Sequence, residues 1–218
     1  MRTLGLLMAL SFLVSCSLEA KLTLLPSGAM GVEATIAVKT QTKDAWRGLR
    51  DLDPSLPVDP FDPGLWRQGL GMRARIITTD TGTSVAFPIP DPRRFFIGLK
   101  TDSGSWDLTL DRATLRRLAS LTTWSGSPVL DSLIPAPGAA VTEADYRDLL
   151  VYLLGPGTST VAAGALVDAS TVQLTIVAPR PVLSAEGSVS IDGNQAVYRW
   201  PLVRVLTLET PLHLRLTF

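Results

Sequence analysis

The chain has 218 residues and a formal net charge of zero, with 46% hydrophobic and 18% charged residues. This composition is typical of a folded protein rather than a disordered one. A chain of this length buries about 70% of its unfolded surface and does not need disulfide or metal staples. The balanced charge gives no electrostatic reason to expect nucleic acid as a partner, because nucleic-acid binding requires a basic patch or stripe.

The N-terminus has the order of a signal peptide. Arg2 provides a positive charge, and residues 4–14 (LGLLMALSFLV) form an apolar run that is too short to span a bilayer. The run leads into Leu13-Val14-Ser15-Cys16, and Cys16 is the only cysteine of the chain. This stretch resembles the lipobox of bacterial lipoproteins. The resemblance covers the first sixteen residues and implies cleavage before Cys16, attachment of diacylglycerol to its sulfur and acylation of its new amino group.

On this interpretation the mature protein lies in the bacterial cell envelope, anchored to a membrane through Cys16 and facing the periplasm or the exterior. Two or more acyl chains anchor a protein stably, whereas one chain is marginal. Residues 1–15 are then the signal peptide, residues 16–20 a lipidated tether, and residues 21–218 a single ectodomain. Such a tether reaches at most ~14 Å, which predicts a domain close to the membrane. The alternative is a chance cysteine after an ordinary signal peptide.

Alternating apolar and polar residues predict strands in the first half of the chain. Hairpins are expected where two such segments flank Gly, Asp or Pro, because these residues favour tight turns. The expected strands are 21–25, 32–39, 72–78, 83–88, 95–100 and 105–110. Short helical turns are expected after Thr42 and over residues 65–70, on either side of a proline-rich loop at 51–64.

Helix signals are concentrated in the middle of the chain. Asp111 is expected to cap a helix in which leucines follow at helical spacing. Thr142 and Asp145 have the spacing of a capping box, and the apolar face behind them ends at the Gly-Pro pair 155–156. Residues 159–169 predict a further short helix.

From residue 171 the pattern returns to β structure. The expected strands are 172–176, 189–191, 196–200 and 212–218. Asp192-Gly193 separates the middle two segments and is a strong hairpin signal; an apolar run at 202–208 lies in the same region. The whole pattern predicts an α+β fold, with antiparallel β hairpins at both ends and two to four helices packed on the sheet.

Two turn sequences, Asp80-Thr81-Gly82 and Asp102-Ser103-Gly104, resemble the catalytic loops of aspartic proteases. These enzymes need two carboxylates that share one proton. Pepsin-like enzymes place one loop in each lobe, whereas these two stand close together in the sequence. A similar turn sequence with Asp and Gly occurs at Asp192-Gly193. Hairpin turns account for all three places, and we interpret them as turns.

A second pattern concerns calcium. Asp51, Asp53, Asp59 and Asp62 place oxygen atoms at the spacing of a calcium loop. The position that requires Gly is Leu56, the final position is Asp rather than Glu, and prolines fix the backbone between them. A proline-rich loop is the preferred interpretation, and we expect neither a metal nor a cofactor.

No catalytic set stands out elsewhere. The only histidine, His213, is predicted on the polar side of its strand, which does not favour a Ser-His-Asp triad. The five tryptophans are spread along the chain and are expected mainly in the core, with an aromatic rim around a ligand groove as the alternative. These observations favour a protein that is not an enzyme.

Three classes of function remain open. The preferred class is a lipid-anchored binding or structural module whose partner is a lipid, another hydrophobic ligand or an envelope protein. The second is a carboxylate-dependent envelope hydrolase, which would need carboxylates that converge in a cleft; the candidates are Asp51, Asp59, Asp62, Asp80 and Asp102. The third is a subunit of an envelope complex, which a large exposed apolar patch would mark.

Overall fold

The computed structural model describes residues 17–37, 50–51, 54, 58, 74–79, 82–94, 96, 99–102, 104–120, 135–154 and 159–218. The strands of this part are β1 (Leu18–Leu24), β2 (Met30–Ala37), β3 (Arg75–Thr79), β4 (Gly82–Ile89), β5 (Lys100–Asp102), β6 (Ser105–Leu110), β7 (Thr171–Val177), β8 (Ser184–Glu186), β9 (Ser190–Asp192), β10 (Gln195–Pro201) and β11 (Leu212–Thr217). The helices are η1 (Pro92–Arg94, a 3₁₀ turn), α4 (Arg112–Ser120), α6 (Glu143–Leu154), α7 (Thr160–Ala169) and α8 (Leu202–Thr207).

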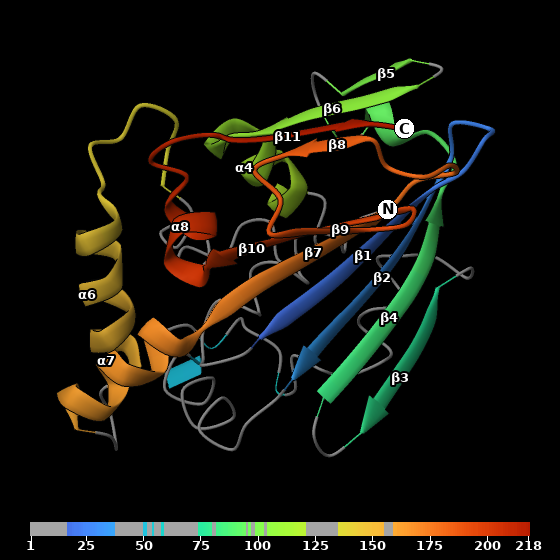
Figure 1. Ribbon diagram of the computed structural model, residues 1–218. Coiled ribbons are helices and arrows are strands. Elements are labelled where there is room, and N and C mark those ends of the chain that lie inside the picture. Colours follow the sequence, from blue (N-terminus) through green and yellow to red (C-terminus); the bar gives the residue numbers. More distant parts are fainter. Residues whose placement is uncertain are drawn as a thin grey trace.

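The described strands form two sheets (Figure 1). The large sheet has seven strands in the order β3-β4-β2-β1-β7-β10-β9, and the small sheet has four in the order β5-β6-β11-β8. One hydrophobic core joins them: Leu22 and Ile176 come from the large sheet, Leu108 and Leu214 from the small one, and all four are buried. The predicted α+β class is confirmed.

The hairpins predicted from local pattern are confirmed. β1 pairs with β2, β3 with β4, β5 with β6, and β9 with β10, all antiparallel. Gly193 has a φ of 56° in the last of these turns, a conformation that glycine adopts without steric cost. β11 has the expected alternation, with Leu212, Leu214 and Leu216 buried and His213 and Arg215 exposed.

The sequence did not predict which distant strands pair, and one of these pairings is parallel. β1 pairs with β7 in parallel, with Leu18 opposite Val172 and Thr23 opposite Val177. This pairing joins the N-terminal group β3-β4-β2-β1 to the C-terminal group β7-β10-β9 in one sheet. The expected hairpins at the two ends of the chain therefore share a single sheet, and it is mixed rather than purely antiparallel.

The strand predicted at 95–100 is wrong at Phe96 and Leu99, which with Lys100 are the described residues of this range. The backbone N–H of Phe96 donates to the carbonyl of Pro92 at 2.9 Å, and the N–H of Leu99 donates to the carbonyl of Phe96 at 3.3 Å. These donors are used in local turns, and the regular strand begins only at Lys100. Phe96 and Leu99 are both buried and stand three residues apart, which is the spacing of a turn rather than of a strand.

The helix starts were predicted correctly. The carboxylate of Asp111 accepts the N–H of Thr114 at 2.7 Å, and Ser159 accepts the N–H of Ala162 at 3.2 Å. Thr142 and Asp145 exchange the bonds of a capping box: the hydroxyl of Thr142 accepts the N–H of Asp145, and the carboxylate of Asp145 accepts the N–H of Thr142. The hydroxyl of Thr142 also donates to the Asp145 carboxylate at 2.7 Å, and this bond, followed by the bond from the N–H of Thr142, holds the pKa of Asp145 below its usual value.

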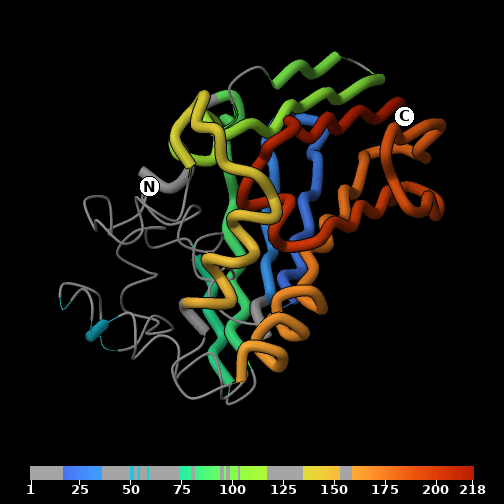
Figure 2. Tube along the Cα trace, turned by 90° about the vertical axis from the view of Figure 1, so that its left-hand side faces the viewer, coloured from blue at the N-terminus to red at the C-terminus, as the bar shows by residue number. Residues whose placement is uncertain are grey.

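The apolar run at 202–208 forms α8, a helix inside the region that was predicted to be β-rich. Five of its six residues are buried: Leu202, Val203, Val205, Leu206 and Thr207. Arg204 alone of the six is exposed, so most of the surface of this helix has to be covered by other elements. α8 lies against β7 and β10, and α6 and α7 cover it from outside. Figure 2, viewed from the side that carries α6 and α7, shows these two helices in front of the strands.

The first strand begins earlier than predicted. β1 starts at Leu18, whose side chain is only 3% exposed and whose backbone pairs with Ile36 and Val172. The tether predicted over residues 16–20 therefore overlaps the sheet. The alternation already includes Leu18, exposed Glu19 and Ala20, so the prediction at 21–25 started this strand three residues too late.

Candidate ligand-binding cavity

A cavity of about 630 Å³ opens at one end of the two-sheet core. The large sheet contributes the turn between β1 and β2, and the segment that follows β7 contributes Pro179 and Arg180. The small sheet contributes the turn between β5 and β6 together with Phe218, which follows β11. Figure 1 shows these turns and the C-terminus together at the same end of the two sheets.

The inner wall of the cavity is apolar. Leu24, Met30 and Trp106 line it and also belong to the hydrophobic core between the sheets. Met30 is 1% exposed and Trp106 is 2% exposed, so both contact the cavity from within the core. A ligand in this cavity would contact the core directly.

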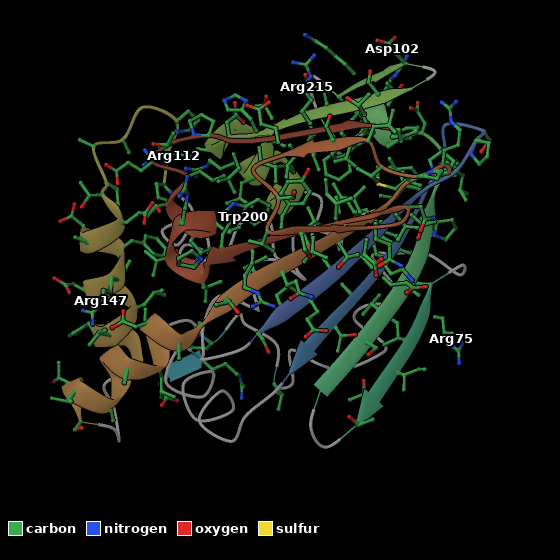
Figure 3. All side chains as sticks on the ribbon, viewed as in Figure 1. Arg75, Asp102, Arg112, Arg147, Trp200 and Arg215 are labelled. Carbon is green, nitrogen blue, oxygen red and sulfur yellow. The ribbon has the colours of Figure 1, made fainter. Side chains whose placement is uncertain are left out.

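The mouth carries opposite charges. Asp102 ends β5 and is exposed (Figure 3), and Arg180, on the segment after β7, also lines the cavity. The guanidinium carbon of Arg180 lies 5.8 Å from the centre of the Phe218 ring, a cation–π distance. The N–H of Phe218 donates to the carbonyl of Gly104 at 2.8 Å, which attaches the end of β11 to the β5–β6 turn. The mouth is thus built from interacting segments of both sheets.

Trp106 is the chemically distinctive residue of the cavity. Its indole N–H is buried and has no hydrogen-bond partner among the described residues. A buried donor without a partner costs about 1–3 kcal/mol, and such groups are uncommon in native proteins. Trp106 therefore combines a place in the cavity lining with a buried donor that has no partner among the described residues.

A second unpaired polar group lies deeper in the core. Tyr198 on β10 is fully buried, its hydroxyl has no partner in the described part of the chain, and its ring stacks on Trp200 with centroids 5.6 Å apart. Burial, and then the charge of Glu186, raises the pKa of Tyr198 to about 12. This unpaired hydroxyl lowers the free energy of unfolding at neutral pH, and it lowers it further in alkali.

We expect Tyr198→Phe to stabilise the protein by about 1 kcal/mol at pH 7, because it removes an unsatisfied buried hydroxyl without opening a cavity. In alkali the unfolded chain loses the phenolic proton near pH 10 and the folded chain only near 12. The wild type therefore loses stability as the pH rises through this window, and the variant loses less. Urea unfolding at pH 7 and pH 11 measures both effects. Tyr152→Phe, at a side chain 77% exposed, is the control; destabilisation by Tyr198→Phe would contradict the prediction.

The predicted lipid and metal sites are described only in part. Cys16 lies outside the described residues, as do Asp53, Asp59 and Asp62. Asp51 is described and exposed. No group of three or more His, Cys, Asp or Glu side chains that would hold a metal ion occurs in the described part of the chain. The calcium pattern and the lipobox therefore stay predictions.

The two turns that resemble protease loops lie at opposite ends of the molecule. The β3–β4 turn follows Thr79, at the end of the large sheet where Gly82 pairs with Ala37. Asp102 lies at the cavity mouth, near the turn between β1 and β2. Asp80 itself is outside the described residues, but the strands around it are in place. A pair of carboxylates sharing one proton requires both loops at one point, and the fold separates them.

Other residues singled out from sequence have ordinary surroundings. His213 is exposed on β11, and its Nδ1 lies 3.1 Å from the hydroxyl of Thr109 on β6. Trp106 lies in the core, as expected, and Trp200 packs against the core from its edge. Trp46, Trp66 and Trp124 lie outside the described residues. No described helix is both long enough and apolar enough to cross a membrane.

The sequence did not predict the cavity. Its lining joins segments from both sheets, and sequence patterns do not show which segments meet at one end. The one available signal was a tryptophan at an inward position of β6, in the alternation of Trp106, Leu108 and Leu110. That pattern places the ring in the core but says nothing about whether its N–H finds a partner.

Comparison with known proteins identifies no family. No protein-family model matches the chain, and no curated protein matches it. One solved structure similar to it is the folded domain of LppM from Mycobacterium tuberculosis, determined by NMR. The similarity covers 94% of this chain and 90% of that one, with 12% sequence identity and a TM-score of 0.41. A TM-score this low does not establish a shared fold, and no property of LppM is transferred to this chain.

Proposed function

We propose that this protein is a lipid-anchored, non-enzymatic lipoprotein of the bacterial cell envelope, and that its cavity binds a hydrophobic molecule carrying a hydrogen-bond acceptor. The observation that carries the proposal is a cavity with an apolar inner wall that includes Trp106, whose buried indole N–H has no partner among the described residues. The lipobox ending at Cys16 supports the anchor.

Size and chemistry favour a ligand with an acyl chain. A volume of about 630 Å³ lies within the range of about 300–1,000 Å³ that is usual for small-molecule sites. Leu24 and Met30 offer contacts to methylene groups, each worth about 0.8 kcal/mol when buried. An ester or carboxyl oxygen on the ligand would accept a hydrogen bond from the indole N–H of Trp106 and remove the cost of leaving this donor unpaired.

The test compares two ligands that differ only in the acceptor. Methyl laurate carries an ester, and dodecane is a hydrocarbon with a chain of equal length. We expect Trp106→Phe to weaken methyl laurate binding about tenfold, since about 1.4 kcal/mol of hydrogen bonding is lost, and to leave dodecane binding nearly unchanged. Isothermal titration of residues 17–218 with each ligand measures the two dissociation constants.

The matched control is Trp200→Phe, which alters a tryptophan that does not line the cavity. This variant should bind both ligands like the wild type. If the wild type binds neither ligand, the cavity does not hold an acyl chain and the proposal is wrong. If Trp106→Phe weakens the binding of both ligands equally, the ring contributes only its shape and its N–H does not recognise the acceptor.

A further inference from the structure

The strand register defines two ends of the large sheet. At one end, Leu18 of β1 lies opposite Ile36 of β2 and Val172 of β7. At the other end, Leu24 lies opposite Met30. A strand of seven residues is about 20 Å long, since each step rises about 3.3 Å. We call these the Leu18 end and the Leu24 end.

The cavity belongs to the Leu24 end. All of its lining from β1, β2 and their turn falls within residues 24–30, and Pro179 and Arg180 follow the last residue of β7. β7 runs parallel to β1, so the residues after Val177 lie at the same end as Leu24. In Figure 1 the loops around the cavity lie at the upper right, and the junction of α7 with β7 lies at the lower left.

The lipid-modified residue belongs to the opposite end. Only Ser17 separates Cys16 from Leu18, and Leu18 is buried and paired on both sides in the sheet. Two steps of extended chain span at most about 7 Å. An acylated Cys16 therefore holds the Leu18 end at the bilayer surface, without the longer tether predicted from sequence.

We infer that the cavity mouth opens away from the membrane that carries the anchor, about 20 Å further out along β1. The inference rests on the acylated Cys16 of the proposed function. Its consequence concerns ligand exchange: the cavity takes up or releases its ligand on the side that faces away from its own bilayer. Direct extraction of a lipid from the anchoring membrane would require the mouth at the opposite end of the sheet.

The experiment measures the depth of each end with the full-length, processed protein in liposomes. Ser27→Cys places a thiol in the turn at the mouth, and Ala169→Cys places one at the end of α7, three residues before Val172. Both positions are exposed, and acylation leaves the introduced cysteine as the only free thiol. A bimane label at each site is then quenched by lipids that carry a nitroxide on the headgroup. Intact mass measured beforehand establishes acylation of Cys16.

We expect several-fold stronger quenching at residue 169 than at residue 27. Equal quenching at both sites, or stronger quenching at 27, would overturn the inference while leaving the anchor intact. Absence of quenching at both sites in an acylated protein would also overturn it, since the Leu18 end would then not lie at the bilayer. A mass without acyl groups would remove the anchor and the orientation together, and leaves the cavity test with methyl laurate unaffected.

Discussion

Replacing Arg112 by Gln is expected to lower the free energy of unfolding by about 3 kcal/mol. Arg112 lies at the start of α4 (Figure 3), and its guanidinium donates to three backbone carbonyls in two other segments of the chain. Nε donates to Thr207 at 2.6 Å, Nη2 donates to Val141 at 2.8 Å, and Nη1 donates to Ala139. One side chain thus connects α4, the segment before α6 and the end of α8.

The size of the effect follows from what the substitution leaves behind. Hydrogen bonds from a charged donor contribute about 1.5–3 kcal/mol each, and carbonyls left unpaired lose stability as well. The bond to Thr207 also supports a strained residue, because Leu208 has a φ of 40° and is not a glycine. Glutamine is shorter and offers donors to at most one of the three carbonyls.

Urea unfolding followed by circular dichroism measures the change. Arg215→Gln is the matched control, because Arg215 is exposed on β11, and exposed substitutions usually change stability by less than about 0.5 kcal/mol. Equal stability of the Arg112 and Arg215 variants would mean that the three carbonyl contacts do not support the fold.

The second large effect is expected in the core. Leu214→Ala should lower the free energy of unfolding by about 3 kcal/mol, because it removes a fully buried side chain between the sheets. Leu214 lies on β11, which has β6 on one side and β8 on the other, so the cavity left behind is walled by strands that cannot close easily. Thermal and urea unfolding measure the loss.

Leu183→Ala provides the comparison, since the side chain of Leu183 is 75% exposed. It removes the same atoms from a solvent-facing position and should cost much less than the core substitution. Similar losses for the two variants would contradict the assignment of the core to the space between the sheets.

Local features were predictable from sequence because their causes are local. The capping pair Thr142 and Asp145, and the turn at Gly193, each place their interacting groups within a few residues of one another. The alternation in β11 reports burial of one face directly. At 92–99 two kinds of local structure competed, and the turns anchored on the carbonyl of Pro92 used donors that a strand would have needed.

Long-range features were not predictable from sequence because their causes lie in segments that are far apart in the chain. The parallel pairing of Leu18 with Val172, the burial of α8 and the meeting of both sheets around the cavity depend on segments that are distant in the sequence. Alternation says that one face of a strand is buried but does not name its neighbour. The candidate site could be assembled only once the order of strands in both sheets was known.

The placement of the first and last strands constrains the order of folding. β1 is central in the large sheet, yet one of its two neighbours, β7, begins only at Thr171. β11, the last strand, is central in the small sheet. The N-terminal hairpins can form early, but their inner faces stay exposed until β7 and β11 pair, and closing so long a loop is slow. Removing residues 212–218 would therefore leave the small sheet without a central strand and the core between the sheets incomplete.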